Sequence, residues 1–240
     1  MLFPSYPKFL LDKKLYLAGG VAAAFECKTT LKAEHVVAAV KTAAELRKNL
    51  PRKTGTPYKE LNSTIVYGLL AHSHSWKGEN SKPAENIEKA LWASDSQFVS
   101  HPIECLDFIT VADLATWSAM KFIIHFNREH IAMNPQLAMG YVPNARCHTA
   151  YPRAEIKAEL QKDYFSPLGV LLSVLFSKLA WIFKDMRTLE EYFRLVDLRG
   201  ASQGNTRIWE VSIFSDQIRD RILNGFLTNE FYNEWNMVYH

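Results

Sequence analysis

Apolar and polar residues follow one another along the first half of the chain in patterns that predict strands. Residues 15–28 are rich in small, aromatic and apolar side chains, and they predict a β-hairpin that turns at "AGG", Ala18–Gly20. Residues 63–73 and 103–113 are short apolar runs with β-branched side chains, which is typical of buried strands. The sequence therefore predicts a sheet built from the N-terminal half.

Helical periodicity separates these strands. Apolar side chains recur at helical spacing between residues 31 and 50, with Thr30 where an N-cap is expected and Pro51 after the end. Residues 82–98 predict a second, surface helix. A helix between two buried strands indicates a crossover connection, so we expect an α/β fold.

The second half of the chain predicts mainly helices. Residues 114–127 are open between a hairpin and a helix, and residues 207–214 predict a strand. The most apolar run, at 168–183, contains Lys178 and is shorter than the roughly 20 residues that span a bilayer, so we expect a buried core helix. We expect an α/β core at 1–153 and a mainly helical region at 154–240 packed on it.

Composition bounds the class of protein. Of the 240 residues, 48% are hydrophobic and 22% are charged, which is ordinary for a globular chain with a sizeable core. The formal net charge of +3 permits binding to a polyanion without requiring it. The three scattered cysteines cannot form a disulfide framework and favour a reducing compartment, so we expect a cytoplasmic protein.

Glu26 and Lys28 lie two residues apart on the strand before the first predicted helix. Because side chains alternate along a strand, both project from one face. If residues 18–20 form a three-residue loop, counting back along the hairpin places Asp12 opposite Glu26. The pattern predicts two carboxylates and an amine on one polar face.

Neighbouring carboxylates repel each other, and a divalent cation removes that cost. Mg²⁺ takes one or two carboxylates together with waters and phosphate oxygens. We expect a site for Mg²⁺ (or Mn²⁺) with Glu26 and Asp12 as carboxylate ligands and the main-chain carbonyl of Cys27 completing the set. There the ion would polarise a scissile phosphate, and Lys28 would orient the attacking water or offset charge on phosphorus. Glu26 and Lys28 are the expected catalytic residues.

The stretch "FECK", Phe25–Lys28, followed by "TTLKAEHV" at the start of a helix, resembles the PD-(D/E)xK signature of the restriction-endonuclease-like nucleases. In that superfamily an aspartate on one strand is followed by E-x-K on the next strand and then by a helix. "AGGVAAAFECKTTLKAEHV" and the later "TIVYGLLAHS" are similar to the domain-of-unknown-function family 6602, whose members carry E-V-K-[ST]-[ST]-L here. The resemblance implies a restriction-endonuclease-like mixed sheet core and metal-dependent hydrolysis of DNA.

The resemblance leaves two positions open for the second carboxylate. In that family the aspartate precedes a proline-containing loop, and "PSYPKFLLDKK" resembles that loop. On this alignment Asp12 is a loop residue, Gly19 replaces a carboxylate common in the family, and the partner aspartate is upstream of Met1 or missing. On the hairpin register, Asp12 is the partner.

A basic cluster on and just after the first predicted helix is the candidate DNA-contacting surface. Lysine and arginine bind DNA phosphates, but near the C-terminus of a helix they are also ordinary partners of the helix dipole. Both interpretations stay open for the members of the cluster, which are Lys41, Arg47, Lys48, Arg52 and Lys53.

The leading hypothesis is a divalent-metal-dependent nuclease-like protein that acts on DNA. A role in restriction or phage defence, with a homodimer or a defence-system partner protein, is implied by the resemblance alone. The alternative is a catalytically inactive nuclease fold that binds nucleic acid or protein. A third hypothesis is an interaction protein that uses the helical C-terminal half. None of these hypotheses involves a membrane.

Overall fold

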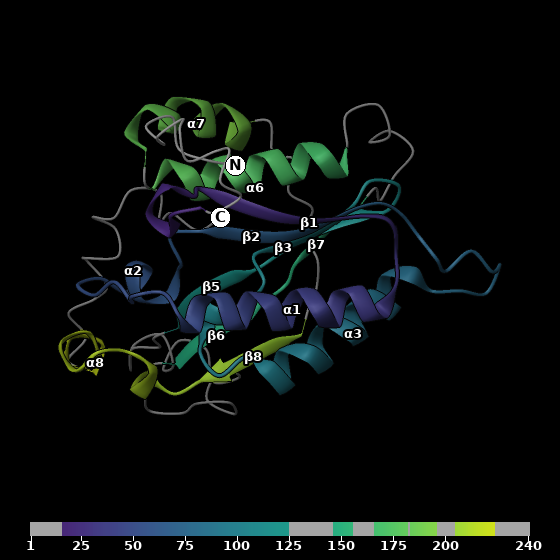
Figure 1. The fold of residues 1–240 in the computed structure, drawn as a ribbon. Helices are drawn as coiled ribbons and strands as arrows, with labels where there is room; N and C mark the ends of the chain where they lie inside the picture. The colour runs from purple at the N-terminus through teal and green to yellow at the C-terminus, as the bar shows by residue number, and fades with distance from the viewer. Residues whose placement is uncertain (1–15, 125–145, 156–165, 182, 196–204, 224–240) are drawn as a thin grey trace, which may run out of the picture. The chain divides into compact units, whose positions relative to one another are not determined.

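The computed structural model describes residues 16–124, 146–155, 166–181, 183–195 and 205–223, which are coloured in Figure 1. The chain forms two compact units. Unit 1 consists of Met1–Leu50, Ser63–Ala119 and Tyr151–Gly204, and unit 2 consists of Pro51–Asn62, Met120–Ala150 and Asn205–His240. The expected division into a core at 1–153 and a helical region at 154–240 stays a prediction.

A five-stranded mixed sheet with the order β1-β2-β3-β4-β7 organises unit 1. Its first three strands are parallel, and the last two are antiparallel to their neighbours. The strands are β1 (Ala23–Leu31), β2 (Val66–His74), β3 (Phe108–Val111), β4 (Ala115–Ser118) and β7 (Arg153–Glu155). Helix α1 (Ala33–Lys48) follows β1, and α3 (Pro83–Phe98) lies between β2 and β3. The predicted crossover helices are confirmed, since α1 connects β1 to its parallel neighbour β2 and α3 connects β2 to its parallel neighbour β3.

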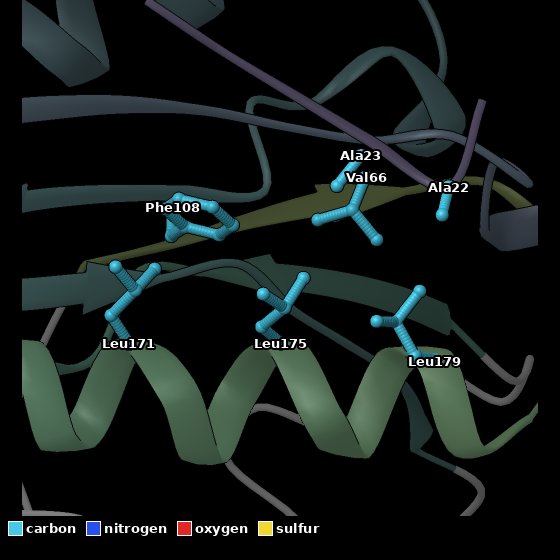
Figure 2. Packing of buried hydrophobic residues seen from close by; sticks show 7 residues of the cluster. All are labelled: Ala22, Ala23, Val66, Phe108, Leu171, Leu175 and Leu179. Atoms are coloured by element: carbon cyan, nitrogen blue, oxygen red, sulfur yellow. The ribbon is translucent and has the colours of Figure 1, made fainter. Parts of the chain in front are cut away.

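Helices cover both faces of this sheet. In Figure 1, α1 and α3 lie together on one side of the sheet of unit 1, and α6 (Pro167–Ala180) lies on the other side, with α7 (Arg187–Leu195) packed on α6. Figure 2 shows three leucines from one side of α6 that point at the sheet, where they pack in one buried cluster with three strand residues and with Ala22, which directly precedes β1. The cluster consists of Leu171, Leu175, Leu179, Ala22, Ala23, Val66 and Phe108.

Helix α6 confirms the buried helix predicted from the apolar run at 168–183. Ser166 accepts a hydrogen bond from the Gly169 main-chain N–H and caps its first turn, and Pro167 occupies the first helical position. Within the part of the chain that the structure describes, no helix combines the length and the apolar character needed to cross a bilayer.

Gly68 makes room for an aromatic pair beneath α6. Phe25, Gly68 and Phe108 are Cα partners in one row across β1, β2 and β3. The rings of the two phenylalanines have centroids 5.6 Å apart, and a Cβ atom on Gly68 would run into the Phe108 ring. The row needs glycine in its centre because the Phe108 ring occupies the space where a Cβ atom would lie.

The start of β1 differs from the prediction. Ala18–Gly20 form a 3₁₀ turn, and β1 runs on to Leu31 as the parallel neighbour of β2. Thr30 is therefore a strand residue, so its predicted N-cap role is wrong. Lys32 precedes α1, and its main-chain N–H donates to Nδ1 of His35 at 3.2 Å. Tyr16 and Leu17, the described part of the other predicted arm, are not in a strand, and the rest of that arm, with Asp12, lies outside the described residues.

Unit 2 contains a three-stranded antiparallel sheet with the order β5-β6-β8. Its strands are β5 (Met120–Ile124), β6 (Arg146–Ala150) and β8 (Thr206–Trp209), and its helices are α2 (Pro57–Leu61) and α8 (Asp216–Leu223). The buried Glu60 accepts hydrogen bonds from the main-chain N–H and the hydroxyl of Ser215, at 2.8 and 2.5 Å. These bonds tie α2 to the start of α8.

The segment at 114–127, left open between a hairpin and a helix, contains the strands β4 and β5. The strand predicted at 207–214 is shorter and ends in a 3₁₀ turn, Val211–Ile213. Further 3₁₀ turns are Pro102–Glu104 and Lys184–Met186.

The fold is the expected mixed α/β fold, and its mixed sheet with flanking helices is consistent with a restriction-endonuclease-like core.

We expect Gly68→Ala to lower the free energy of unfolding by about 1–3 kcal/mol, because the added methyl group overpacks the aromatic row. Urea denaturation measures the loss. The control is Gly78→Ala, since a Cβ atom there meets nothing within 4 Å. The control should stay within about 0.5 kcal/mol of the parent. Equal losses in both variants would contradict the assigned role of Gly68.

Candidate functional site

Glu26 and Lys28 project from the face of β1 that is opposite to α6. Ala23 belongs to the buried cluster under α6 and Phe25 packs against it, so alternation turns Glu26 and Lys28 to the other face. Their head groups converge, with Lys28 Nζ 3.6 Å from Glu26 Oε2. The side chains of Glu26 and Lys28 are 23% and 33% exposed, so solvent reaches both. The prediction that they share one face is confirmed.

Tyr67 completes this arrangement from the neighbouring strand. Its phenol donates a hydrogen bond to Glu26 Oε1 at 2.6 Å, a short distance that is typical of a hydroxyl bound to a charged carboxylate. Burial, then the hydrogen bond and charge of Glu26, raise the pKa of the Tyr67 phenol well above its ordinary value, against a smaller opposing effect of Thr42 and Arg47. The phenol therefore remains a donor, and each oxygen of Glu26 has a polar partner.

The donors available to a hard cation begin with Glu26. Cys27 is exposed on the face opposite to Glu26, and only its main-chain carbonyl is a hard oxygen donor. The predicted second carboxylate, Asp12, lies outside the described residues. Within residues 16–124 and the other described ranges, no three His, Cys, Asp or Glu side chains group in a way that could hold a metal ion. One carboxylate and one carbonyl fit a hydrated Mg²⁺ ion, which keeps several waters and binds phosphate oxygens.

A buried ionic network lies behind Tyr67. The Asp107 carboxylate pairs with the Arg47 guanidinium of α1 and with Lys178 Nζ of α6, the latter at 3.1 Å. Asp107 also accepts a hydrogen bond from the main-chain N–H of Tyr67 at 2.9 Å. Arg47 further donates to the Cys105 carbonyl at 2.6 Å. One carboxylate thus joins α1, β2 and α6.

One member of the predicted basic cluster, Arg47, is buried. Arg47 is 2% exposed and its guanidinium is bound to Asp107, so it offers no group to a phosphate and is left out of the proposed DNA surface. Lys41 and Lys48 are exposed on α1, and Lys41 Nζ is 3.8 Å from a Glu45 carboxylate oxygen. The two remaining cluster residues, Arg52 and Lys53, are exposed and belong to unit 2.

Tyr67 and Asp107 are the residues of this region that the sequence did not reveal. Tyr67 stands in the apolar run "STIVYGLLAHS", where a tyrosine reads as a core residue. Its contact with Glu26 spans 41 positions and depends on the parallel register of β1 and β2. The pattern of one strand does not contain that register.

No family model and no curated protein matches this chain. Among solved structures it is similar to P. aeruginosa ATCC27853 NucC in its cAAA-bound form, with a TM-score of 0.32 and 18% sequence identity. The similarity covers 77% of this chain and 56% of that chain, so this protein spans little more than half of the NucC length. A likeness at this level supports no conclusion on fold or function.

We expect Arg47→Met to lower the free energy of unfolding by about 3 kcal/mol, because it removes one partner of a buried carboxylate and keeps the apolar stem. Lys48→Met, the neighbouring exposed position, is the control and should change stability by less than about 0.5 kcal/mol. Urea denaturation followed by circular dichroism compares the two variants. If both unfolded at the same urea concentration, the Arg47–Asp107 pair would not have the stabilising role described here.

Proposed function

We propose that this protein is a divalent-metal-dependent nuclease-like enzyme that hydrolyses DNA phosphodiester bonds. The observation that carries the proposal is the convergence of the Glu26 carboxylate and the Lys28 ammonium on the face of β1 opposite to α6, 3.6 Å apart. The resemblance of "FECK" to the E-x-K half of the PD-(D/E)xK signature supports the same chemistry. In β1, as in that signature, an acid and an amine project from one strand that is followed by a helix.

In this proposal Glu26 is the carboxylate ligand of Mg²⁺ (or Mn²⁺), the Cys27 carbonyl is a second ligand, and Asp12 is the further carboxylate. The bound ion would supply Lewis-acid polarisation of the scissile phosphate and a more acidic coordinated water. Lys28 is the catalytic lysine: its ammonium donates to the water that attacks and offsets the negative charge that develops on phosphorus. The partial exposure of both side chains leaves them accessible to a phosphate.

Lys41 and Lys48 are the proposed DNA contacts of unit 1. They lie seven residues apart, which places both on one side of α1 and about 10 Å apart along its axis. Exposed ammonium groups with this spacing can neutralise phosphates of one backbone. A cytoplasmic role in restriction or phage defence, and a homodimer or a partner protein, belong to the proposal on the resemblance alone.

A catalytically inactive nuclease fold is the second candidate function. The observation that favours it is that both oxygens of Glu26 already have partners, Tyr67 on Oε1 and Lys28 on Oε2. A carboxylate satisfied in this way also suits a purely structural ion pair. Such a protein would bind nucleic acid or protein without cleaving DNA.

We expect Glu26→Gln and Lys28→Ala each to lower the rate of plasmid cleavage with Mg²⁺ or Mn²⁺ by about 100-fold or more, as happens when one charge-stabilising group is lost from an active site. Gel electrophoresis of supercoiled plasmid over time measures the rate. Omission of the metal, or addition of a chelator, should abolish cleavage by the parent protein.

The controls for charge are Glu85→Gln and Lys77→Ala. Glu85 pairs with Lys82 at 3.0 Å and Lys77 pairs with Asp113 at 2.9 Å, and all four residues are exposed or at the surface of unit 1. Both control variants should cleave at the parent rate. Equal background nicking by the parent and Lys28→Ala would contradict the proposed enzyme activity and favour the binding module.

Replacing both Lys41 and Lys48 by alanine should weaken DNA binding and reduce its salt dependence. The slope of log K against log salt is negative, and each lost phosphate contact reduces its magnitude by about 0.9. The slope of the double variant should therefore be smaller in magnitude by about 1.8. Fluorescence anisotropy with a labelled duplex across a salt series measures the slope. A double variant of Lys77 and Lys82 has the same net charge and should keep the parent slope. Identical slopes in both would exclude α1 as the contact surface.

A further inference from the structure

Tyr67 is held in place at both of its polar ends. Its main-chain N–H donates to Asp107 Oδ2 at 2.9 Å, and its phenol donates to Glu26 Oε1 at 2.6 Å. The residue is 6% exposed, so water does not compete effectively for either bond. The bond to Asp107 therefore fixes the main chain of Tyr67, and its side chain cannot turn away from Glu26 without losing a buried hydrogen bond.

The anchor of Tyr67 is itself rigid. Asp107 pairs with Arg47 from α1 and with Lys178 from α6, so two helices hold the carboxylate that binds the Tyr67 main chain. A continuous set of polar contacts thus runs from this network through Tyr67 to Glu26. The Glu26 carboxylate is the partly exposed end of that set, and the other members are buried or nearly so.

We propose that Tyr67 is the positioning residue of the site, because its phenol holds Glu26 Oε1 and leaves Oε2, on the side of Lys28, for the metal ion. This inference rests on the proposed nuclease function. Ordering a glutamate side chain on binding costs rotamer entropy, and a carboxylate that is already ordered avoids that cost. Hydrogen-bonding partners of metal ligands commonly have this effect on metal affinity.

The chemistry of the phenol suits this task better than that of a cation. Lys28 already places one ammonium 3.6 Å from Glu26 Oε2, and a second cation at position 67 would further weaken the attraction of this carboxylate for a divalent ion. A phenol donates one directed hydrogen bond and leaves the negative charge of the carboxylate in place. The phenol therefore restrains the rotamer of Glu26 without placing a second positive charge beside it.

Tyr67→Phe tests the inference, since it keeps the ring and removes the hydroxyl. We expect the affinity for Mn²⁺, measured by isothermal titration calorimetry on the full chain, to fall about 10-fold. The Mg²⁺ concentration that gives half-maximal plasmid cleavage should rise by a similar factor. The rate at saturating Mg²⁺ should be largely restored, because a positioning defect is overcome by excess metal.

The matched control is Tyr151→Phe. The phenol of Tyr151 donates to Asp95 Oδ2 at 2.9 Å, and the residue is buried in the same unit. Its carboxylate partner is thus Asp95 and not Glu26. Both variants lose a buried hydrogen bond between a tyrosine and a carboxylate, so both should unfold at lower urea. Only Tyr67→Phe should bind Mn²⁺ more weakly. Unchanged Mn²⁺ affinity in Tyr67→Phe, or an equal loss in both variants, overturns the positioning role.

Glu26→Gln separates failure of this inference from failure of the proposed function. If Glu26→Gln binds Mn²⁺ as the parent does, Glu26 is not a metal ligand and the proposed function fails. Crystal structures of the parent and of Tyr67→Phe without metal then decide the positioning role. A displaced or multiply oriented Glu26 carboxylate in Tyr67→Phe supports it, and an unchanged rotamer overturns it.

Discussion

The buried carboxylate of Asp107 is the interaction on which the arrangement of unit 1 depends. Removed from water, this charge is tolerated only because Arg47, Lys178 and the main-chain N–H of Tyr67 satisfy it together. Each partner comes from a different element, so a shift of α1 or α6 would separate a buried ion pair, and a shift of β2 would break a buried hydrogen bond. The carboxylate therefore restrains both helices relative to the sheet, in addition to the apolar packing beneath α6.

The site on β1 combines this rigid support with access to solvent. Parallel pairing with β2 along its whole length holds the main chain of β1, and the Phe25–Phe108 pair holds the side that faces α6. The head groups of Glu26 and Lys28 nevertheless remain partly exposed. Preorganised groups on a regular element, open on one side only, are what a site for charged substrates requires.

Much of the fold follows from local pattern, and much of the site does not. The long periodic helices α1 and α3 and the shared face of Glu26 and Lys28 need only the repeats of helix and strand. Arg47 also continues the apolar stripe of Val36, Val40 and Ala43 on α1, so its burial had a signal that its basic neighbours obscured. Strands of three to five residues such as β4, β6 and β7 give too few alternations to be recognised. The contact between Tyr67 and Glu26 arises from long-range pairing, which no local pattern encodes.

The two unlike faces of β1 also protect its chemistry while the chain folds. Strand side chains repeat every two residues, so a slip of β1 by one position would carry Glu26 among the leucines of α6 and turn Phe25 outward. Placing an unpaired carboxylate in that hydrocarbon layer is strongly unfavourable. The shifted register is therefore disfavoured during folding. The contrast between the apolar and the charged face of β1 selects the register in which Glu26 and Lys28 reach solvent together.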